Sequence, residues 1–274
     1  MCKYVERESQ VSGRVELPGF LYGFYERRLL RDLSRDRIPR HIGVMVDGNR
    51  RWAKQRLLGG FQGHRAGVET VRVLLKLCRE LGIEYLTIYA FSTENWTRSD
   101  DEVGFLMKLF EEAIEKEIDE LVANGVRLRF IGDLGALPPS LQARIDSAMA
   151  ATAHNSAITL NVAANYGGRR EILKAAQALA VRVAGGELRV EELNEEALAG
   201  ELYTAGQPDP DLLIRTSGEA RISNYLLWQI AYTEIYFTDV LWPEFRQPQF
   251  LDALIDYQKR DRRFGGTSKP QVKA

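Results

Sequence analysis

The sequence predicts an α/β fold, with a mostly parallel central sheet of about six strands flanked by helices. Short apolar runs alternate along the chain with longer segments of helical periodicity. Most of the runs are continuous in their apolar residues, which is typical of strands buried on both faces. The 274 residues are 45% apolar and 27% charged, the composition of an ordinary globular protein.

The first half of the chain contains three of these runs. Residues 42–47 predict the first strand, and helical spacing follows over 68–81. Residues 85–91 predict the second strand, and a long amphipathic helix is expected over 103–121. Residues 126–131 predict a third strand with one solvated face, because apolar residues alternate there with arginines.

The second half contains two more runs and two further helical segments. A Pro-Pro pair at 138–139 is typical of a helix start. Residues 158–164 and 212–214 predict the fourth and fifth strands. Apolar residues over 225–230 have helical spacing, so we expect a helix there with Glu234 at its end.

The composition also excludes several classes of protein. Lys plus Arg is 37 and Asp plus Glu is 38, so a net charge of −1 gives no general attraction for nucleic acid. The two cysteines cannot build a disulfide framework or a four-thiolate zinc site. Polar residues interrupt the longest charge-free stretch, which is therefore too polar to span a membrane. We expect a cytosolic protein.

The first 37 residues differ from the rest and are predicted to form an amphipathic extension. Aromatic residues over 20–25 precede Arg27, Arg28 and Arg31, a pattern typical of a short basic amphipathic helix. Two interpretations stay open. The helix packs on its own domain or on a partner subunit, or it contacts the inner face of a membrane.

Polar residues concentrate just after the predicted strands, where open parallel sheets bind their ligands. The groups follow the first, second, fourth and fifth strands, at 47–52, 92–98, 165–170 and 215–223, and contain seven arginines. Forked guanidinium donors suit phosphate oxygens. The sequence therefore predicts a phosphorylated ligand with more than one phosphate. The glycine-rich loop of a P-loop nucleotidase is missing.

Asp47 stands among these arginines and has two interpretations. It pairs with Arg50 or Arg51, or it holds Mg²⁺, an ion that usually takes one or two carboxylates plus substrate phosphates. Glu234 is the expected second acid, because an unpaired charge at the end of an apolar stretch is costly. His64 precedes a predicted helix beside glycines and is a candidate phosphate contact. Residues 100–102 are three acids that oppose the dipole of a helix start.

Five ordered segments resemble the signatures of the cis-prenyltransferases, the undecaprenyl diphosphate synthase family. The first lies in 41–67 and contains the run Asp47-Gly48-Asn49-Arg50-Arg51-Trp52-Ala53. The others lie at 89–96, 161–169, 213–219 and 224–242. The resemblance covers residues 38–266, which we interpret as the catalytic domain, followed by a flexible tail over 267–274.

The resemblance implies that isopentenyl diphosphate is condensed with geranyl or farnesyl diphosphate to give a Z-configured polyprenyl diphosphate. It also implies a homodimer, a hydrophobic tunnel for the product and Mg²⁺ as cofactor, held by Asp47 and by Glu234 across the dimer. Asp47 and Asn95 are the implied catalytic residues. The implied substrate-binding residues are Gly48, Asn49, Arg50, Arg51, Trp52, His64, Ser92, Thr93, Glu94, Trp96, Arg98, Arg215, Arg221, Ile222 and Ser223.

Three positions depart from the family pattern. Arg50 stands where many members have glycine, Gly60 where an arginine is common, and Ala220 where some members have histidine. The small Ala90 favours a tunnel open to longer products. Two alternatives to a long-chain synthase stay open. The chain is a non-catalytic subunit that binds prenyl diphosphates, or it is a relative that makes a short or branched product. A tail motif at 263–265 resembles one that reaches into the neighbouring subunit.

Overall fold

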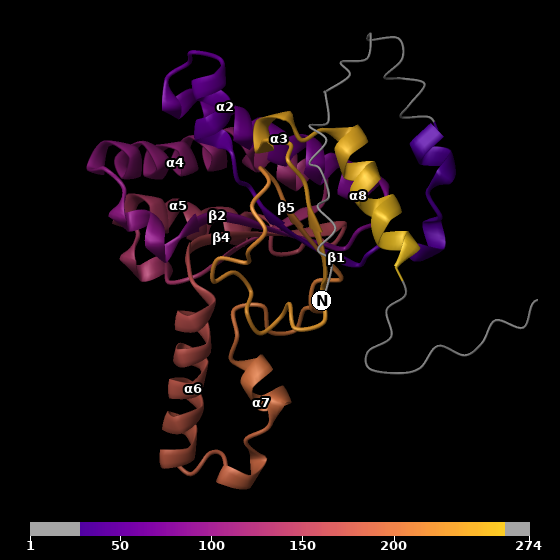
Figure 1. Ribbon diagram of the computed structural model, residues 1–274. Helices are drawn as coiled ribbons and strands as arrows, with labels where there is room; N and C mark the ends of the chain where they lie inside the picture. The colour runs from indigo at the N-terminus through magenta and orange to yellow at the C-terminus, as the bar shows by residue number, and fades with distance from the viewer. Residues whose placement is uncertain (1–27, 261–274) are drawn as a thin grey trace, which may run out of the picture.

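All six strands of the sheet run parallel, in the order β3-β4-β2-β1-β5-β6 (Figure 1). The computed structural model describes residues 28–260. The strands are β1 (His41–Met45), β2 (Tyr85–Ser92), β3 (Val126–Ile131), β4 (Ile158–Tyr166), β5 (Leu212–Arg215) and β6 (Glu234–Phe237). The predicted sheet is confirmed, including its number of strands.

Helices connect the strands and cover the sheet (Figure 1). They are α2 (Asn49–Gln55), α3 (Gly60–Glu80), α4 (Asp100–Ala123), α5 (Pro139–Ala151), α6 (Gly168–Ala184), α7 (Glu195–Gly200) and α8 (Gln247–Lys259). The sequence did not predict α2, and α3 begins eight residues before the predicted start. No helix in the described part of the chain is both long enough and apolar enough to cross a membrane.

Among the strands of residues 28–260, β3 lies at one edge of the sheet and pairs only with β4. Arg127 is exposed and Arg129 is half-buried, whereas the intervening apolar side chains are buried. An edge strand leaves more of its surface to solvent than a central strand does. The predicted solvated face of this strand is therefore confirmed.

Residues 225–230 do not form the predicted helix. Ser223, Asn224 and Leu226 have positive φ values of 43°, 62° and 45°, a left-handed backbone that a right-handed helix excludes. The segment is a series of turns that buries Tyr225 and Leu226 against one face of the sheet. Its apolar spacing reflects these turns, and Glu234 begins strand β6 instead of ending a helix.

The described end of the N-terminal extension packs on its own domain. Residues 28–32 are helical, and Leu29 and Leu33 belong to the main apolar core. The amide of Ser34 donates to Gln258 Oε1 of α8 at 2.9 Å. The aromatic part of the predicted helix, over 20–25, lies outside the described residues, and so does the tail motif at 263–265.

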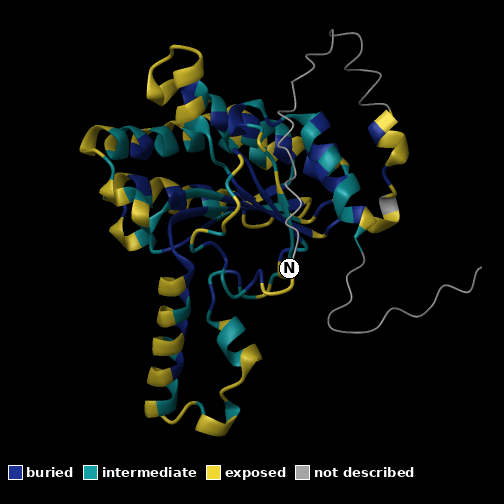
Figure 2. Cartoon of the chain, in the orientation of Figure 1, coloured by how far each residue is buried: buried dark blue, intermediate teal, exposed yellow. Residues whose placement is uncertain are grey.

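Helices α6 and α7 project from the body as an arm (Figure 1). The outer side of α6 is exposed, and its inner side is buried (Figure 2). Glu171 at the base of α6 is a buried carboxylate that accepts hydrogen bonds from the Tyr166 hydroxyl, the Tyr203 amide and Gln229 Nε2. These bonds connect the arm to the loop after α7 and to the turns over 225–230.

His41 at the start of β1 is completely buried, and both of its ring nitrogens have partners. Nδ1 lies 2.7 Å from the Pro208 carbonyl oxygen, which can only accept, so Nδ1 carries the proton. Nε2 lies 2.7 Å from Thr87 Oγ1. Burial lowers the pKa of His41 to about 4, because a charged ring would lose its hydration there.

We expect His41 to make the fold sensitive to acid. The unfolded chain titrates this ring near pH 6.5, so between pH 6.5 and 4 the unfolded state binds more protons and stability falls as the pH is lowered. His41 should account for a loss of about 3 kcal/mol across that window, and for none above it. Urea unfolding at several pH values checks this for the wild type and His41→Asn. Exposed His154 provides the control variant, His154→Asn, and equal pH slopes in wild type and His41→Asn would contradict the prediction.

Candidate active site

Asp47 and Arg215 meet where strands β1 and β5 end. The register pairs Met45 with Arg215, and Asp47 follows two residues later. Arg215 Nε donates to Asp47 Oδ2 at 2.8 Å, and its Nη2 lies 2.7 Å from the same oxygen. The Arg215 side chain is only 4% exposed, whereas that of Asp47 is 41% exposed. The alternative pairing of Asp47 with Arg50 or Arg51 is therefore wrong.

The segment that follows β5 holds the other end of the Arg215 guanidinium. Arg215 Nη1 donates to Ser223 Oγ at 2.9 Å and to the carbonyl oxygen of Arg221. Ser223 can take this position because its backbone is left-handed, with φ at 43°. Four predicted site residues are thus brought together, and three acceptors fix the direction of a buried positive charge.

Glu219 forms ion pairs with two more of the predicted arginines, Arg51 and Arg221. Arg51 donates to Glu219 Oε1 at 3.0 Å and to Ser217 Oγ at 2.6 Å, and Arg221 pairs with the other oxygen of Glu219. Partial burial acts to raise the pKa of Glu219, but the neighbouring arginines, Arg221 first, lower it below its ordinary value. The edge of the sheet therefore carries a dense cluster of guanidinium groups with fewer carboxylates.

Gly48 lets the chain turn from β1 into α2. Its φ is 106°, which L side chains rarely adopt, and a Cβ there would lie 2.9 Å from Leu241 Cδ2. The tight turn directs residues 49–52 along the same edge as Arg215. This is the position that the sequence predicted for them.

Two glycines of α3 allow its first turns to lie against the start of α2. A Cβ at Gly63 would overlap the backbone carbonyl oxygen of Asn49, and a Cβ at Gly67 would lie 2.6 Å from Asn49 Oδ1. Asn49 Nδ2 donates to the Val46 carbonyl at 3.2 Å. These contacts hold the Asn49 side chain between the two helices.

Replacing Gly63 by alanine should destabilise the protein by about 1–3 kcal/mol, because backbone has to move to admit the methyl group. Denaturant unfolding measures the change. Gly104→Ala in α4 is the matched control, since a Cβ there would meet no atom within 4 Å. That control should be neutral or more stable by up to about 1 kcal/mol, from helix propensity alone. A Gly63→Ala protein as stable as the wild type would contradict the close approach.

Glu102 is a site residue that sequence reasoning missed. It lies in the first turn of α4, its side chain is 12% exposed, and its backbone amide donates to Ser99 Oγ at 3.4 Å. Arg98 donates to Glu102 Oε1 at 2.9 Å, Arg50 lies 3.5 Å from Oε2, and His64 Nε2 lies 3.7 Å from Oε1. The spacing of a serine and a glutamate at 99 and 102 signals the helix start. This spacing does not indicate that Arg50 of α2, His64 of α3 and Arg98 all lie close to Glu102 of α4.

Three buried polar atoms at this site have no hydrogen-bond partner among the described residues. They are Asn49 Oδ1, Trp52 Nε1 and His64 Nε2. Burial and the charge of Arg98 lower the pKa of His64, so its ring is neutral at pH 7. Buried polar groups are nearly always paired, and groups left unpaired indicate a missing ligand or water. All three belong to the predicted substrate-binding set.

The residues that follow β2 form another group of polar side chains at the ends of the strands. Asn95 Oδ1 accepts from the Ser92 amide at 3.1 Å, and Trp96 Nε1 donates to Asn165 Oδ1 at 2.8 Å. Asn224 Nδ2 donates to Glu94 Oε1 at 3.0 Å. Asn165 and Asn224 thus connect the end of β2 to the ends of β4 and β5. The sequence grouped Asn165 with the strand ends, placed Asn224 only in the segment 224–242, and assigned neither to the site.

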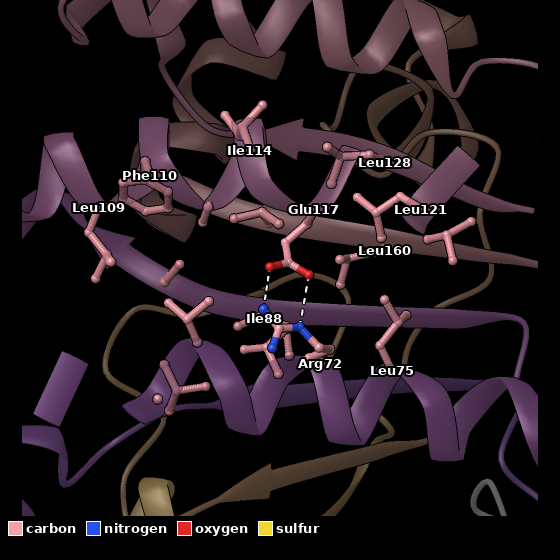
Figure 3. Close-up of a pocket in the computed structure, with 18 of the residues that line it drawn as sticks. Arg72, Leu75, Ile88, Leu109, Phe110, Ile114, Glu117, Leu121, Leu128 and Leu160 are labelled. Carbon is pink, nitrogen blue, oxygen red and sulfur yellow. Dashed lines mark hydrogen bonds and ion pairs between the residues drawn. The ribbon is translucent and has the colours of Figure 1, made fainter. Parts of the chain in front are cut away.

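A cavity of about 410 Å³ opens beside this polar edge. Asn49 and His64 line it beside the polar edge. Apolar side chains of α3, α4 and strands β2 to β4 line most of the rest, together with the charged Arg72 and Glu117 (Figure 3). Ala90 of β2 is one of the lining residues. Helix α4 and strand β2 therefore border a mostly apolar space.

Glu234 does not join Asp47 within one chain. It pairs with Arg260 Nη1 at 3.0 Å, and the register places it beside Leu212 at the beginning of β5. Asp47 lies beyond the other end of the same strands, at least about 10 Å away at 3.3 Å per residue. Within residues 28–260, no group of three or more metal-ligating side chains is assembled.

The structure shows what surrounds two of the three residues that depart from the family pattern, Arg50 and Gly60. Arg50 is directed toward Glu102, and a Cβ at Gly60 would meet no atom within 4 Å. Gly60 therefore leaves open space at the start of α3. Ile222, from the predicted binding set, is partly buried and packs against the apolar cluster beneath the turns over 225–230.

Known proteins resemble this chain over most of its length. The family model described as "Putative undecaprenyl diphosphate synthase" matches residues 45–265. A ditrans,polycis-undecaprenyl-diphosphate synthase of Pseudomonas aeruginosa, named as (2E,6E)-farnesyl-diphosphate specific, is 53% identical over 237 residues. That match covers 86% of this chain and 94% of the relative.

Two solved structures share the fold as well as the sequence similarity. Lavandulyl diphosphate synthase from Lavandula x intermedia, in complex with dimethylallyl diphosphate, has a TM-score of 0.82 and 39% identity, covering 84% of this chain and 99% of that one. A probable undecaprenyl diphosphate synthase from Campylobacter jejuni has a TM-score of 0.69 and 36% identity, covering 83% and 98%. The chain therefore belongs to the undecaprenyl diphosphate synthase family and is a prenyltransferase.

Proposed function

We propose that this enzyme condenses isopentenyl diphosphate with an allylic diphosphate to give a Z-configured polyprenyl diphosphate. One observation carries the proposal: a cluster of arginines lies at the strand ends, beside a mostly apolar cavity that Asn49 and His64 line at the same edge. A diphosphate group matches the forked guanidinium donors, and a hydrocarbon chain matches the cavity. The names of the relatives support the same substrate class.

The reaction exchanges one carbon–oxygen bond for a carbon–carbon bond. The bond between the allylic carbon and its diphosphate breaks, and the diphosphate leaves with the electron pair. The double bond of isopentenyl diphosphate attacks that carbon, and the new chain then loses a proton. Positive groups close to the departing diphosphate lower the barrier, because they stabilise charge that develops in the transition state.

We assign the substrate groups to two sides of the site. Arg215, Arg221, Ser223 and His64 bind isopentenyl diphosphate, and residues 48–52 bind the allylic diphosphate. Asn95 takes part in the removal of the proton, and Ser92, Thr93, Glu94, Trp96 and Arg98 shape the site around it. The unpaired Asn49 Oδ1, Trp52 Nε1 and His64 Nε2 support these assignments.

Asp47 suits a Mg²⁺ ion. Both contacts of its carboxylate with Arg215 use Oδ2, and the side chain is partly exposed beside groups that favour phosphates. This fits the preference of Mg²⁺ for one or two carboxylates together with substrate phosphates. When bound, Mg²⁺ would neutralise charge on the departing diphosphate. Asp47 would hold it while Arg215 stays oriented by the same carboxylate.

We propose that two copies of the chain form a homodimer in which Glu234 contributes to the partner's site. The distance between Glu234 and Asp47 along the strands within one chain is the first support. The second is that the arm exposes several large apolar side chains, namely those of Leu173, Val181, Val190 and Leu193. Exposed apolar patches on a folded protein often mark an interface.

Mixing inactive variants tests the shared site. If Asp47 and Glu234 of different chains act together, Asp47→Ala and Glu234→Ala proteins should each be inactive but should regain activity as mixed dimers. Each mixed dimer then contains one intact site. If both residues act within one chain, every site in the mixture is damaged and no activity returns. Sedimentation equilibrium establishes whether dimers are present.

The function itself is tested with labelled isopentenyl diphosphate, Mg²⁺ and three primers: dimethylallyl, geranyl and farnesyl diphosphate. We expect extracted product whose chain length is read by chromatography. No product from any primer, with folded dimeric protein, would favour the non-catalytic binding subunit. Mass and branching analysis of the product would identify a relative that makes a short or branched compound. The cytosolic location and the contact of residues 20–31 with a membrane stay predictions.

A further inference from the structure

The cavity follows the gap between α3 and α4 over its whole length. Asn49 and His64 lie at its polar end, and Arg79 and Asn124 lie at its far end. There Arg79 Nη1 donates to the carbonyl oxygen of Asn124 at 3.2 Å. At 1.5 Å per residue along α3, the fifteen residues from His64 to Arg79 span about 22 Å.

An ion pair lies about halfway along this space. Arg72 Nε donates to Glu117 Oε2 at 2.8 Å, and Arg72 Nη2 binds the other oxygen of the same carboxylate (Figure 3). Arg72 is eight residues after His64 on α3, which is about 12 Å. The two side chains line the cavity and are only 30% and 18% exposed. Hydrogen bonding to Glu117 raises the pKa of Arg72 above its ordinary value.

The helical wall of the cavity is more polar beyond the ion pair than before it. Before it, the helices present apolar side chains such as Val68, Val71 and Ile114. Beyond it, they also present Lys76 and Glu120, whereas the sheet side remains apolar. A bidentate contact between guanidinium and carboxylate has a fixed geometry. It therefore holds the facing surfaces of α3 and α4 at one spacing.

A long prenyl chain in this cavity meets the pair about halfway along. The volume of about 410 Å³ lies near the lower end of the range of roughly 300–1,000 Å³ for small-ligand pockets. A chain that grows past the midpoint must either separate the two helices or lie against the half-buried charges of Arg72 and Glu117 and exclude water from them, which is unfavourable. A short chain ends before it reaches Arg72.

We propose that the Arg72–Glu117 ion pair determines product length, by limiting how far α3 and α4 separate around the growing chain. The inference rests on the proposed function. Both residues act as positioning residues, because neither lies at the phosphate-binding edge where bonds change. The pair acts on late condensations and leaves the first one unaffected.

Product length in a double-mutant cycle tests this role. Glu117→Gln and Arg72→Gln should each lengthen the main product by at least one isoprene unit. The double variant should go no further than either single variant, because both remove the same contact. The rate of the first condensation should stay within about twofold of wild type. Glu112→Gln is the matched control, since it breaks the exposed Arg65–Glu112 pair, at 2.8 Å, between the same helices outside the cavity.

Unchanged or shorter products from variants with a normal first condensation would overturn the inference. So would longer products from Glu112→Gln, because the effect would then be a general loosening of the helix pair. Arg72→Lys keeps a positive charge but loses the bidentate contact, so longer products are expected from it even if the glutamine variants fold poorly. A wild-type enzyme that makes no prenyl product would instead contradict the proposed function.

Discussion

Asp47→Ala is expected to reduce turnover at least about 10³-fold, the upper range for removal of one preorganised electrostatic group. The carboxylate has two roles in the proposed mechanism. It orients the buried guanidinium of Arg215 through contacts of 2.7 and 2.8 Å, and it is the proposed Mg²⁺ ligand. Both roles are lost together in the alanine variant. The measurement is steady-state turnover at saturating Mg²⁺ and substrates.

The fold should survive this substitution. Removal of one partner from a buried ion pair is costly because it leaves the other charge unpaired. Arg215 nevertheless keeps Ser223 Oγ and the carbonyl oxygen of Arg221, and the site of Asp47 is open to water. Circular dichroism and thermal unfolding check this point. Glu115→Ala, which removes the acid of an exposed pair with Arg144 at 3.1 Å, is the control and should be fully active. Near-normal turnover of Asp47→Ala, or its unfolding, would overturn the assigned role.

Arg215→Ala is expected to raise the KM for isopentenyl diphosphate at least about tenfold, a loss of about 1.4 kcal/mol or more in binding. The guanidinium is 4% exposed, and three acceptors fix its direction. A fixed charge in a site with little water interacts more strongly with a diphosphate than a mobile surface arginine does. Initial rates at varied isopentenyl diphosphate and saturating allylic primer give the KM.

Two further variants show whether geometry or charge matters at this position. Arg215→Lys keeps a positive charge but presents a single ammonium group, so its KM should also rise. Arg144→Ala removes the arginine of the exposed pair on α5 and should leave the KM unchanged. A folded Arg215→Ala enzyme with the wild-type KM would place this arginine outside the substrate site.

The strands were predictable because their signals are local. Apolar runs, continuous or alternating with arginines at 126–131, predicted β1 to β5 within two residues at each end, and Pro138–Pro139 marked the start of α5. Residues 225–230 were misread, because turns with left-handed residues bury the same apolar positions as a helix would. The short helix α2 was missed because its polar residues carry no apolar periodicity.

For the candidate site, the residue types were also predictable from the sequence, whereas their contacts were not. The residue types after each strand predicted a phosphate-binding edge, since parallel strands end on one side of a sheet. The partners of each residue were not predictable. Asp47 pairs with Arg215, 168 residues later, instead of with Arg50 or Arg51 beside it in sequence. Glu102 contacts Arg50, Arg98 and His64, although its own sequence context indicates only a helix start.

The sequence by itself determined the fold class, the edge where the chemistry lies and the family to which the chain belongs. These properties depend on periodicity, on residue type and on ordered motifs, all of which are local in sequence. Only the tertiary structure decided which charges meet, which buried polar atoms lack a partner, and that Arg72 and Glu117 meet across an apolar cavity. Such contacts join residues that are far apart in the chain, and only the packing of helices on the sheet brings them within hydrogen-bonding distance.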